Sequence, residues 1–261
     1  MVKPKVGLST LFCLGESFNK MVDKIVGMNV EFIEIVDDGL HSLNKKRVNV
    51  LKELKASHGF KYSVHAPFAD INIASPSKPL LRVMMKRLKK SMVYANDLDC
   101  EVWVFHSGLK TGISSFYPGK DWLQNLASIR ELCKFASDYG LMIAVENTPE
   151  PYSFLLKRVE DFEKFYSEFD VGLGVALDVG HANICGQTEK FLTVFRDKIV
   201  HLHVHDNDGQ SDLHLGVGEG TVNWERVAGL VKNLPFENLI VVVESIFNVE
   251  KSLVRLKNLF S

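Results

Sequence analysis

The stretch KIVHLHVHDN, residues 198–207, carries a histidine at every second position of a β-rich run. Side chains of a strand point alternately to its two faces, so His201, His203 and His205 share one face. The apolar residues between them share the other face. Such a strand can pack against a core on one side and present imidazoles to a binding site on the other.

Seven further β-rich runs occur along the chain. They cover residues 5–10, 31–37, 61–67, 101–108, 141–147, 171–180 and 238–245. Several are apolar almost throughout, as expected of parallel strands that are covered on both faces. Segments with helical periodicity follow some of the runs, at residues 78–97, 122–139, 154–169, 222–234 and 249–260. Eight strand–helix units predict a single (β/α)8 TIM barrel over residues 1–261, because doubly wound sheets usually have fewer strands.

The composition is that of an ordinary globular chain, with 46% hydrophobic and 24% charged residues. The net charge of −1 provides no general basic field for nucleic acid or a membrane surface. A basic run at residues 82–90 lies on a helical segment, and we interpret it as a solvated outer face. The chain shows neither the pattern of a signal peptide nor the ~18 apolar residues of a membrane span. We therefore expect a cytoplasmic protein that binds no membrane.

Polar side chains end six consecutive predicted strands. Because the carboxyl ends of barrel strands meet at one mouth, where the active sites of such barrels lie, we expect these groups to converge. Together they would repel or desolvate each other without added positive charge, which a divalent cation supplies. Imidazoles combined with carboxylates suit zinc, manganese, iron or cobalt. The candidate ligands are His65, His106, Glu146, Asp178, His181, His203, Asp212, His214 and Glu244.

Seven motifs contain these residues. In chain order they are VHAPFADINIAS (64–75), VFHSG (104–108), VENTPEP (145–151), LDVGHA (177–182), HVHDND (203–208), DLHLGVGEG (212–220) and VVES (242–245). They resemble the xylose isomerase-like barrels, a superfamily that includes sugar isomerases and epimerases and also endonuclease IV. The resemblance covers residues 30–245. It is specific, because the order, spacing and strand position of the motifs all agree.

The resemblance implies roles for individual residues. In sugar epimerases of this superfamily, one metal ion is held by residues that correspond to Glu146, Asp178, His203 and Glu244. The two glutamates move protons at a sugar carbon, and His181 contacts a substrate oxygen. Endonuclease IV holds three zinc ions with a larger set, whose further positions are occupied here by His65, His106, Asp212 and His214. One to three divalent ions (Zn, Mn, Co or Fe) are therefore implied.

Two enzymatic functions are compatible with this set. We favour a sugar or sugar-phosphate isomerase or epimerase that acts through a metal-stabilised enediolate, with Glu146 and Glu244 as paired proton carriers. The alternative is an endonuclease IV-like enzyme that hydrolyses abasic DNA at a multinuclear zinc site. The complete nine-residue set favours the nuclease, whereas the near-neutral charge disfavours it. DNDGQ (206–210) lacks an arginine that the epimerases often carry there. A non-catalytic metal-dependent sugar or phosphate binding protein is a lesser alternative.

Some residues near the strand ends are candidates for substrate contact. Glu34 ends the second predicted strand, and its structural alternative is a solvated side chain. Asn147 follows Glu146, and its structural alternative is a hydrogen bond that holds the loop. Phe68 falls where endonuclease IV has an aromatic residue near DNA. The partner is thus a small sugar or sugar phosphate, or DNA under the alternative, and the sequence sets no oligomeric state.

The other polar residues of the opening stretch have supporting roles in this interpretation. His201 should lie one layer deeper in the barrel than His203, and His205 at or beyond the mouth, where both act in packing or as outer-shell partners. Asp206 is a candidate for holding a ligand histidine by its ring N–H.

Overall fold

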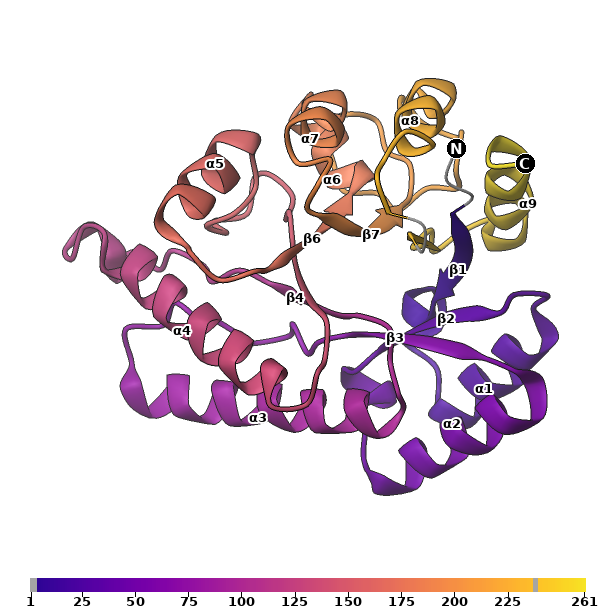
Figure 1. Cartoon of the computed structure of the whole chain (residues 1–261), viewed down its shortest axis with the longest axis horizontal. Helices are drawn as coiled ribbons and strands as arrows, with labels where there is room; N and C mark the ends of the chain where they lie inside the picture. Colours follow the sequence, from indigo (N-terminus) through magenta and orange to yellow (C-terminus); the bar gives the residue numbers. More distant parts are fainter. Residues whose placement is uncertain (1–3, 237–238) are drawn as a thin grey trace.

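The computed structural model describes residues 4–236 and 239–261. Within these residues, eight parallel strands form a closed barrel in the order β1 to β8, which confirms the predicted architecture (Figure 1). The strands are β1 (Lys5–Ser9), β2 (Phe32–Val36), β3 (Lys61–His65), β4 (Trp103–His106), β5 (Ile143–Glu146), β6 (Gly174–Asp178), β7 (Ile199–Val204) and β8 (Ile240–Val243). All eight fall inside the predicted runs.

Helices surround the barrel and cover the outward faces of the strands (Figure 1). The α-helices are α1 (Phe18–Gly27), α2 (Lys45–His58), α3 (Lys78–Asp97), α4 (Lys120–Ser137), α5 (Val159–Glu168), α6 (Val179–Ile184), α7 (Thr188–Val194), α8 (Trp224–Val231) and α9 (Val249–Leu259). Short 3-10 helices are η1 (Thr10–Cys13), η2 (Gly39–His41) and η3 (Gly112–Ser115). In the described residues, no helix is both long enough and apolar enough to cross a membrane.

The start of α5 differs from the prediction, because the helix begins at Val159 instead of residue 154. The preceding segment is tied to two barrel loops by backbone hydrogen bonds. Leu155 N donates to Gly108 O at 2.9 Å, and Thr148 N donates to Leu156 O at 3.1 Å. These bonds hold the segment against the mouth of the barrel.

The basic run also needs a correction, because Arg87 is not part of a solvated face. Its guanidinium contacts both carboxylate oxygens of Asp37, which is fully buried just beyond β2, at 2.6 and 2.9 Å. The same carboxylate accepts a hydrogen bond from Leu43 N. Arg87 therefore connects α3 to the loop after β2, a contact that the helical pattern alone does not show.

The interior of the barrel is divided into two layers. The apolar layer consists of Phe32, Val102, Val104, Ala144, Ala176, Ile240 and Val242. Alternate residues of a strand share a face, so the next inward position lies two residues further toward the carboxyl end. Two residues beyond Phe32, Val104, Ala144, Ala176 and Val242 lie Glu34, His106, Glu146, Asp178 and Glu244, and two residues beyond His201 lies His203; these six residues form the polar layer. The fold thus directs the predicted ligands to the carboxyl-terminal mouth.

Candidate metal centre

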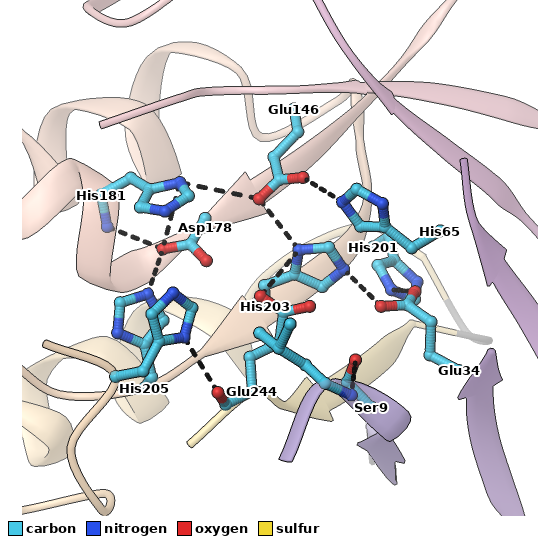
Figure 2. Close-up of polar contacts among 12 residues, drawn as sticks. Ser9, Glu34, His65, Glu146, Asp178, His181, His201, His203, His205 and Glu244 are labelled. Carbon is cyan, nitrogen blue, oxygen red and sulfur yellow. Dashed lines mark hydrogen bonds and ion pairs between the residues drawn. The ribbon is translucent and has the colours of Figure 1, made fainter. Parts of the chain in front are cut away.

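Strand register brings the polar side chains to one level of the barrel. His106 pairs with Glu146 across β4 and β5, and Asp178 pairs with His203 across β6 and β7. Asp178 is also the N-cap of α6, and its Oδ1 accepts a hydrogen bond from His181 N at 2.7 Å. This cap places His181 beside the strand ends. All nine predicted ligands lie in one connected cluster, much of which Figure 2 shows.

The first ligand group is centred on one oxygen of Glu146. Nε2 of His65 and Nε2 of His106 each lie 3.1 Å from Oε2 of this carboxylate. His65 and Glu146 are buried, and His106 is partly exposed. Two imidazoles and a carboxylate around a common point form a suitable three-ligand set for zinc or a similar ion.

The second group shares Glu146 with the first. Nδ1 of His203 lies 3.0 Å from Oε1 of Glu146 and 3.6 Å from Oε2 of Glu244. Asp178 completes this group of four, all of which are buried. Figure 2 shows His203 between the two glutamates.

The third group lies beside α6 and the loop after β7. Oδ2 of Asp212 is 3.4 Å from Nε2 of His181 and 3.4 Å from Nε2 of His214. His205 adjoins this group, with its ring stacked on His214 at 3.9 Å between centroids. Its Nε2 lies 3.2 Å from Oδ1 of Asp178, so His205 is fully buried inside the cluster and does not lie beyond the mouth.

The orientation of three rings fits metal coordination. Nδ1 of each ring contacts a backbone carbonyl oxygen, so a proton on Nδ1 leaves the Nε2 lone pair directed into the cluster. The contacts are His65 with Ala66 O, His181 with Asn147 O and His214 with Glu244 O, at 2.9, 2.8 and 2.9 Å. Among the described residues, buried Asp178 Oδ2, Asp212 Oδ1 and His205 Nε2 have no hydrogen-bond partner. The donor set and these unpaired atoms both fit bound divalent ions.

The same contacts displace the pKa values of the cluster. Burial alone would lower the pKa of His65, but the Glu146 carboxylate outweighs it and raises this pKa to about 9. Burial would also lower the pKa of His181, but the carboxylates of Asp178 and Asp212 outweigh it and raise this pKa to about 10. Burial would raise the pKa of Glu146, yet His203 and His106 hold it well below its usual range. In the metal-free protein, protons therefore occupy ligand atoms that a cation would take.

A cavity of about 440 Å³ opens above the cluster. Its floor is formed by ligands from all three groups, and its wall is apolar or aromatic. The wall residues are Leu11, Val36, Phe68, Leu109, Pro149, Tyr152 and Phe154. Of the described residues that line it, none is a lysine or an arginine. Apolar strand-end residues such as Leu11 and Val36 could not be recognised from the sequence, because they look like ordinary core residues.

The three candidates for substrate contact lie in different places. Phe68 lines the cavity, with its ring centroid 5.4 Å from that of His65. Glu34 is not solvated, because it is fully buried beneath His203, and it is not among the described residues that line the cavity. Asn147 holds a loop: its Nδ2 donates to Asp178 O and its Oδ1 accepts from Asp178 N. Both polar atoms of this buried side chain are therefore bonded to the Asp178 backbone.

Asp206 has a different role from the predicted one, because its carboxylate contacts no ligand histidine. It accepts hydrogen bonds from Gly218 N, Val222 N and the indole N–H of Trp224. These bonds fasten the GVGEG turn (216–220) to the end of β7. Asp206 therefore shapes the loop that carries Asp212 and His214.

Comparisons with known proteins agree with this architecture. The profile of the xylose isomerase-like TIM barrel family matches residues 22–257. The uncharacterized protein MJ1311 of Methanocaldococcus jannaschii is 32% identical over 242 residues, which cover 91% of this chain and 83% of that protein. A D-psicose 3-epimerase of Ruminiclostridium cellulolyticum is 21% identical over 234 residues, or 85% of this chain and 76% of that enzyme.

Similarity also extends to a solved structure. The crystal structure of a D-tagatose 3-epimerase-like protein is 32% identical and superimposes with a TM-score of 0.91, covering 98% of this chain and 96% of that chain. The matched profile spans β2 to β8 and every residue of the three ligand groups. The chain therefore belongs to the xylose isomerase-like TIM barrel family.

Proposed function

We propose that the protein is a divalent-metal-dependent isomerase or epimerase of a small sugar. The proposal rests on the position of Glu146 and Glu244, whose carboxylates line one cavity and approach the same nitrogen of His203. A cavity of about 440 Å³ has the size of a small-molecule site. Two carboxylates facing one sugar can remove a proton from carbon and return it. The 3-epimerase among the relatives supports the same chemistry.

The two glutamates are the proton carriers. They reach the cavity from β5 and from the end of β8, so they approach a bound sugar from different sides. One carboxylate takes a proton from a carbon that bears a hydroxyl next to a carbonyl. Return of a proton to the other face of that carbon inverts its configuration, and return to the neighbouring carbon isomerises the sugar.

Other residues bind and orient the substrate. Glu146, Asp178, His203 and Glu244 would hold a divalent cation, whose charge stabilises negative charge that develops on adjacent substrate oxygens. His181 lines the cavity with Nδ1 turned to Asn147 O, and its Nε2, which lies 3.4 Å from Oδ2 of Asp212, would contact a substrate hydroxyl when no metal ion occupies the third group. The aromatic wall around Phe68 covers the substrate on its other side.

Phosphodiester hydrolysis is the second candidate, and one observation favours it. The three ligand groups adjoin each other through Glu146 and Asp178, as a multinuclear hydrolytic site requires. The cavity disfavours DNA, because nucleic-acid binding depends strongly on Lys and Arg contacts to phosphates and none of the described lining residues is a lysine or an arginine. The small cavity therefore supports the sugar substrate.

Solvent exchange tests the proposal without knowledge of the product. The protein is loaded with Mn²⁺, Co²⁺ or Zn²⁺ and incubated in D₂O with a panel of free ketoses, aldoses and their phosphate esters. Proton removal from carbon incorporates deuterium next to the carbonyl, which NMR detects. Nicking of an abasic oligonucleotide and the metal content per chain are measured on the same samples.

Matched variants connect the result to the site. Glu146→Gln should abolish deuterium incorporation, whereas Glu250→Gln on the exposed face of α9 should leave it unchanged. Deuterium incorporation into a sugar without nicking would support the proposal. Nicking by a form with three zinc ions per chain, without exchange into any sugar, would establish the nuclease instead.

A further inference from the structure

Beneath the metal centre, the ligand His203 forms a cluster with Glu34 and His201, two titratable side chains that the proposed reaction does not use. Oε2 of Glu34 on β2 lies 2.9 Å from Nε2 of His201, and its Oε1 lies 3.0 Å from Nε2 of His203. The hydroxyl of Ser63 on β3 donates to the same Oε2 at 3.0 Å. Figure 2 shows that Glu34 and Glu146 approach different nitrogens of the His203 ring.

This cluster lies where a barrel is ordinarily filled with branched apolar residues. Glu34, His201 and His203 are all fully buried. His201 is flanked in the sheet by Ala176 and Ile240, both of the apolar layer. Burial of a carboxylate at such a depth costs several kcal/mol unless it is paired. Glu34 is therefore stabilised only through its contacts, and two of the three are imidazoles.

A proton can lie between Oε1 of Glu34 and Nε2 of His203. In the described part of the chain, neither Nε2 of His203 nor Oε1 of Glu34 forms a hydrogen bond, not even with the other, although the two atoms lie 3.0 Å apart. A neutral imidazole carries one proton, on either of its two nitrogens. Because Nδ1 faces Glu146 and Glu244, a metal bound by Nδ1 would leave the proton on Nε2, which lies 3.0 Å from Oε1 of Glu34.

A metal ion between the same side chains is the competing interpretation, since their ligand atoms lie close enough together to hold one. Such an ion would need a route past the second ligand group, because Glu34, His201 and His203 are fully buried and none of them lines the cavity, whereas Glu146 and Glu244 do. It would also have to share the His203 ring with the metal centre above it. A proton on Nε2 of His203 would account for the contact with Glu34 without an entry route for a metal ion and without a second metal on the His203 ring.

We infer that Glu34 is a positioning residue for His203: its carboxylate accepts the Nε2 proton and holds the ring so that the Nδ1 lone pair faces Glu146 and Glu244. This inference rests on the proposed role of His203 as a metal ligand. A carboxylate behind a ligand imidazole fixes its tautomer and raises its basicity, and loss of such a partner typically lowers metal affinity about 10–100-fold. Ser63 donates a hydrogen bond to the second oxygen of the carboxylate, and Nε2 of His201 lies 2.9 Å from the same atom.

Glu34→Gln tests the inference, because it keeps the shape of the side chain but removes the charge and presents an amide NH₂ to one of the two rings. Glu31→Gln is the matched control, since Glu31 is exposed immediately before β2 and pairs with Lys61. Zinc affinity is measured by competition with a chromophoric chelator. We expect the dissociation constant to rise about 10–100-fold in Glu34→Gln and to stay unchanged in the control. The absorption spectrum of the cobalt-loaded variant should change as well.

A second measurement does not depend on the folding of the variant. Long-range ¹H–¹⁵N correlation spectra of the zinc-loaded wild-type protein should show His203 with a proton on Nε2 and with Nδ1 bound to metal. If Glu34→Gln does not fold, Ser63→Ala provides a milder change, for which we expect a loss of zinc affinity of a few-fold, below the range given for removal of the carboxylate.

Three results would overturn the inference. They are a His203 Nε2 without a proton, a folded Glu34→Gln variant with wild-type zinc affinity, and the loss of one zinc equivalent from that variant with the affinity of the remaining ions unchanged. The last result would identify a metal bound by Glu34. If the wild-type protein binds zinc as described but exchanges no sugar proton, the proposed function fails and the inference on Glu34 stands.

Discussion

The two layers of the barrel interior are built on the same strands, yet they differ in what holds them. Ala144 precedes Glu146 by two residues on β5, and Ala176 precedes Asp178 by two on β6. The apolar layer is stabilised by the removal of apolar surface from water. The polar layer contains buried charges whose desolvation opposes folding unless they are paired or bound to a cation. A step of two residues along a strand therefore separates a stabilising region from a functional one.

The largest effect is expected in the polar layer, for Glu244→Gln. Turnover should fall about 10²–10⁴-fold, which is the usual contribution of a positioned general acid or base. The free energy of unfolding of the metal-free protein should not decrease. Burial raises the pKa of Glu244, and the nearby carboxylates of Glu146 and Glu34 raise it further, against the opposing effect of His203. The substitution removes the unfavourable buried charge of Glu244.

The rate is measured on the sugar identified by deuterium exchange, and stability is measured by urea denaturation. A Glu244→Gln variant that retains both its metal and full activity would show that the catalytic site has been placed wrongly.

The corresponding change in the apolar layer is Phe32→Ala. Phe32 is buried at the amino-terminal end of β2, and truncation of a buried phenylalanine typically costs about 3–5 kcal/mol of unfolding free energy. Zinc content and kcat, measured at a temperature where the variant remains folded, should match those of the wild-type protein. A specific loss of zinc from the folded variant would contradict the separation of the two layers.

The pH dependence of the unfolding free energy of the metal-free protein also distinguishes the polar layer from the apolar layer. Carboxylates outweigh burial and raise the pKa values of His65 and His214 to about 9, from an ordinary value of 6.5. A raised pKa stabilises the folded state fully below pH 6.5, and this contribution is lost as the pH rises through 9. The free energy of unfolding should therefore fall over this interval, with a slope of about 1.4 kcal/mol per pH unit for each such histidine.

Zinc affinity should rise over the same interval, because the ligands lose the protons that compete with the metal. Denaturation in the presence of a chelator and zinc competition assays measure the two trends. Phe32→Ala serves as the control, since it should shift the stability curve downward without a change of slope. A flat stability curve for the metal-free protein would argue against protonated ligands.

The smallest effect is expected for Gly180→Ala at the start of α6. A Cβ at this position would lie 2.2 Å from Cε1 of His205, so the ring must move. Overpacking of this kind costs about 1–3 kcal/mol of unfolding free energy. Zinc bound by the third group should weaken, whereas the Glu146–His203 group should keep its ion. Gly229→Ala, where an added Cβ meets no atom within 4 Å, is the control for a glycine in a helix.

Much of the site follows from the sequence because of barrel topology. In a closed parallel barrel the carboxyl ends of successive strands are neighbours, so His65, His106 and Glu146 must lie close together once the strands are recognised. The alternating histidines of β7 also show which side chains share the interior face. Strand periodicity and residue type therefore determined the fold and the mouth, and the resemblance to a known superfamily selected His203 among the three histidines of β7.

Tertiary structure decided which groups contact each other. Glu34 and Asn147 stand at strand ends as the ligands do, yet one lies beneath His203 and the other bonds to the Asp178 backbone. Arg87 lies in an ordinary basic helix and pairs with a buried Asp37. The depth of a side chain depends on register between strands, including the shift at Val175 and Ala176 where β6 meets β7. Local sequence patterns encode the direction of a side chain along one strand, whereas its partners come from strands and helices distant in the chain.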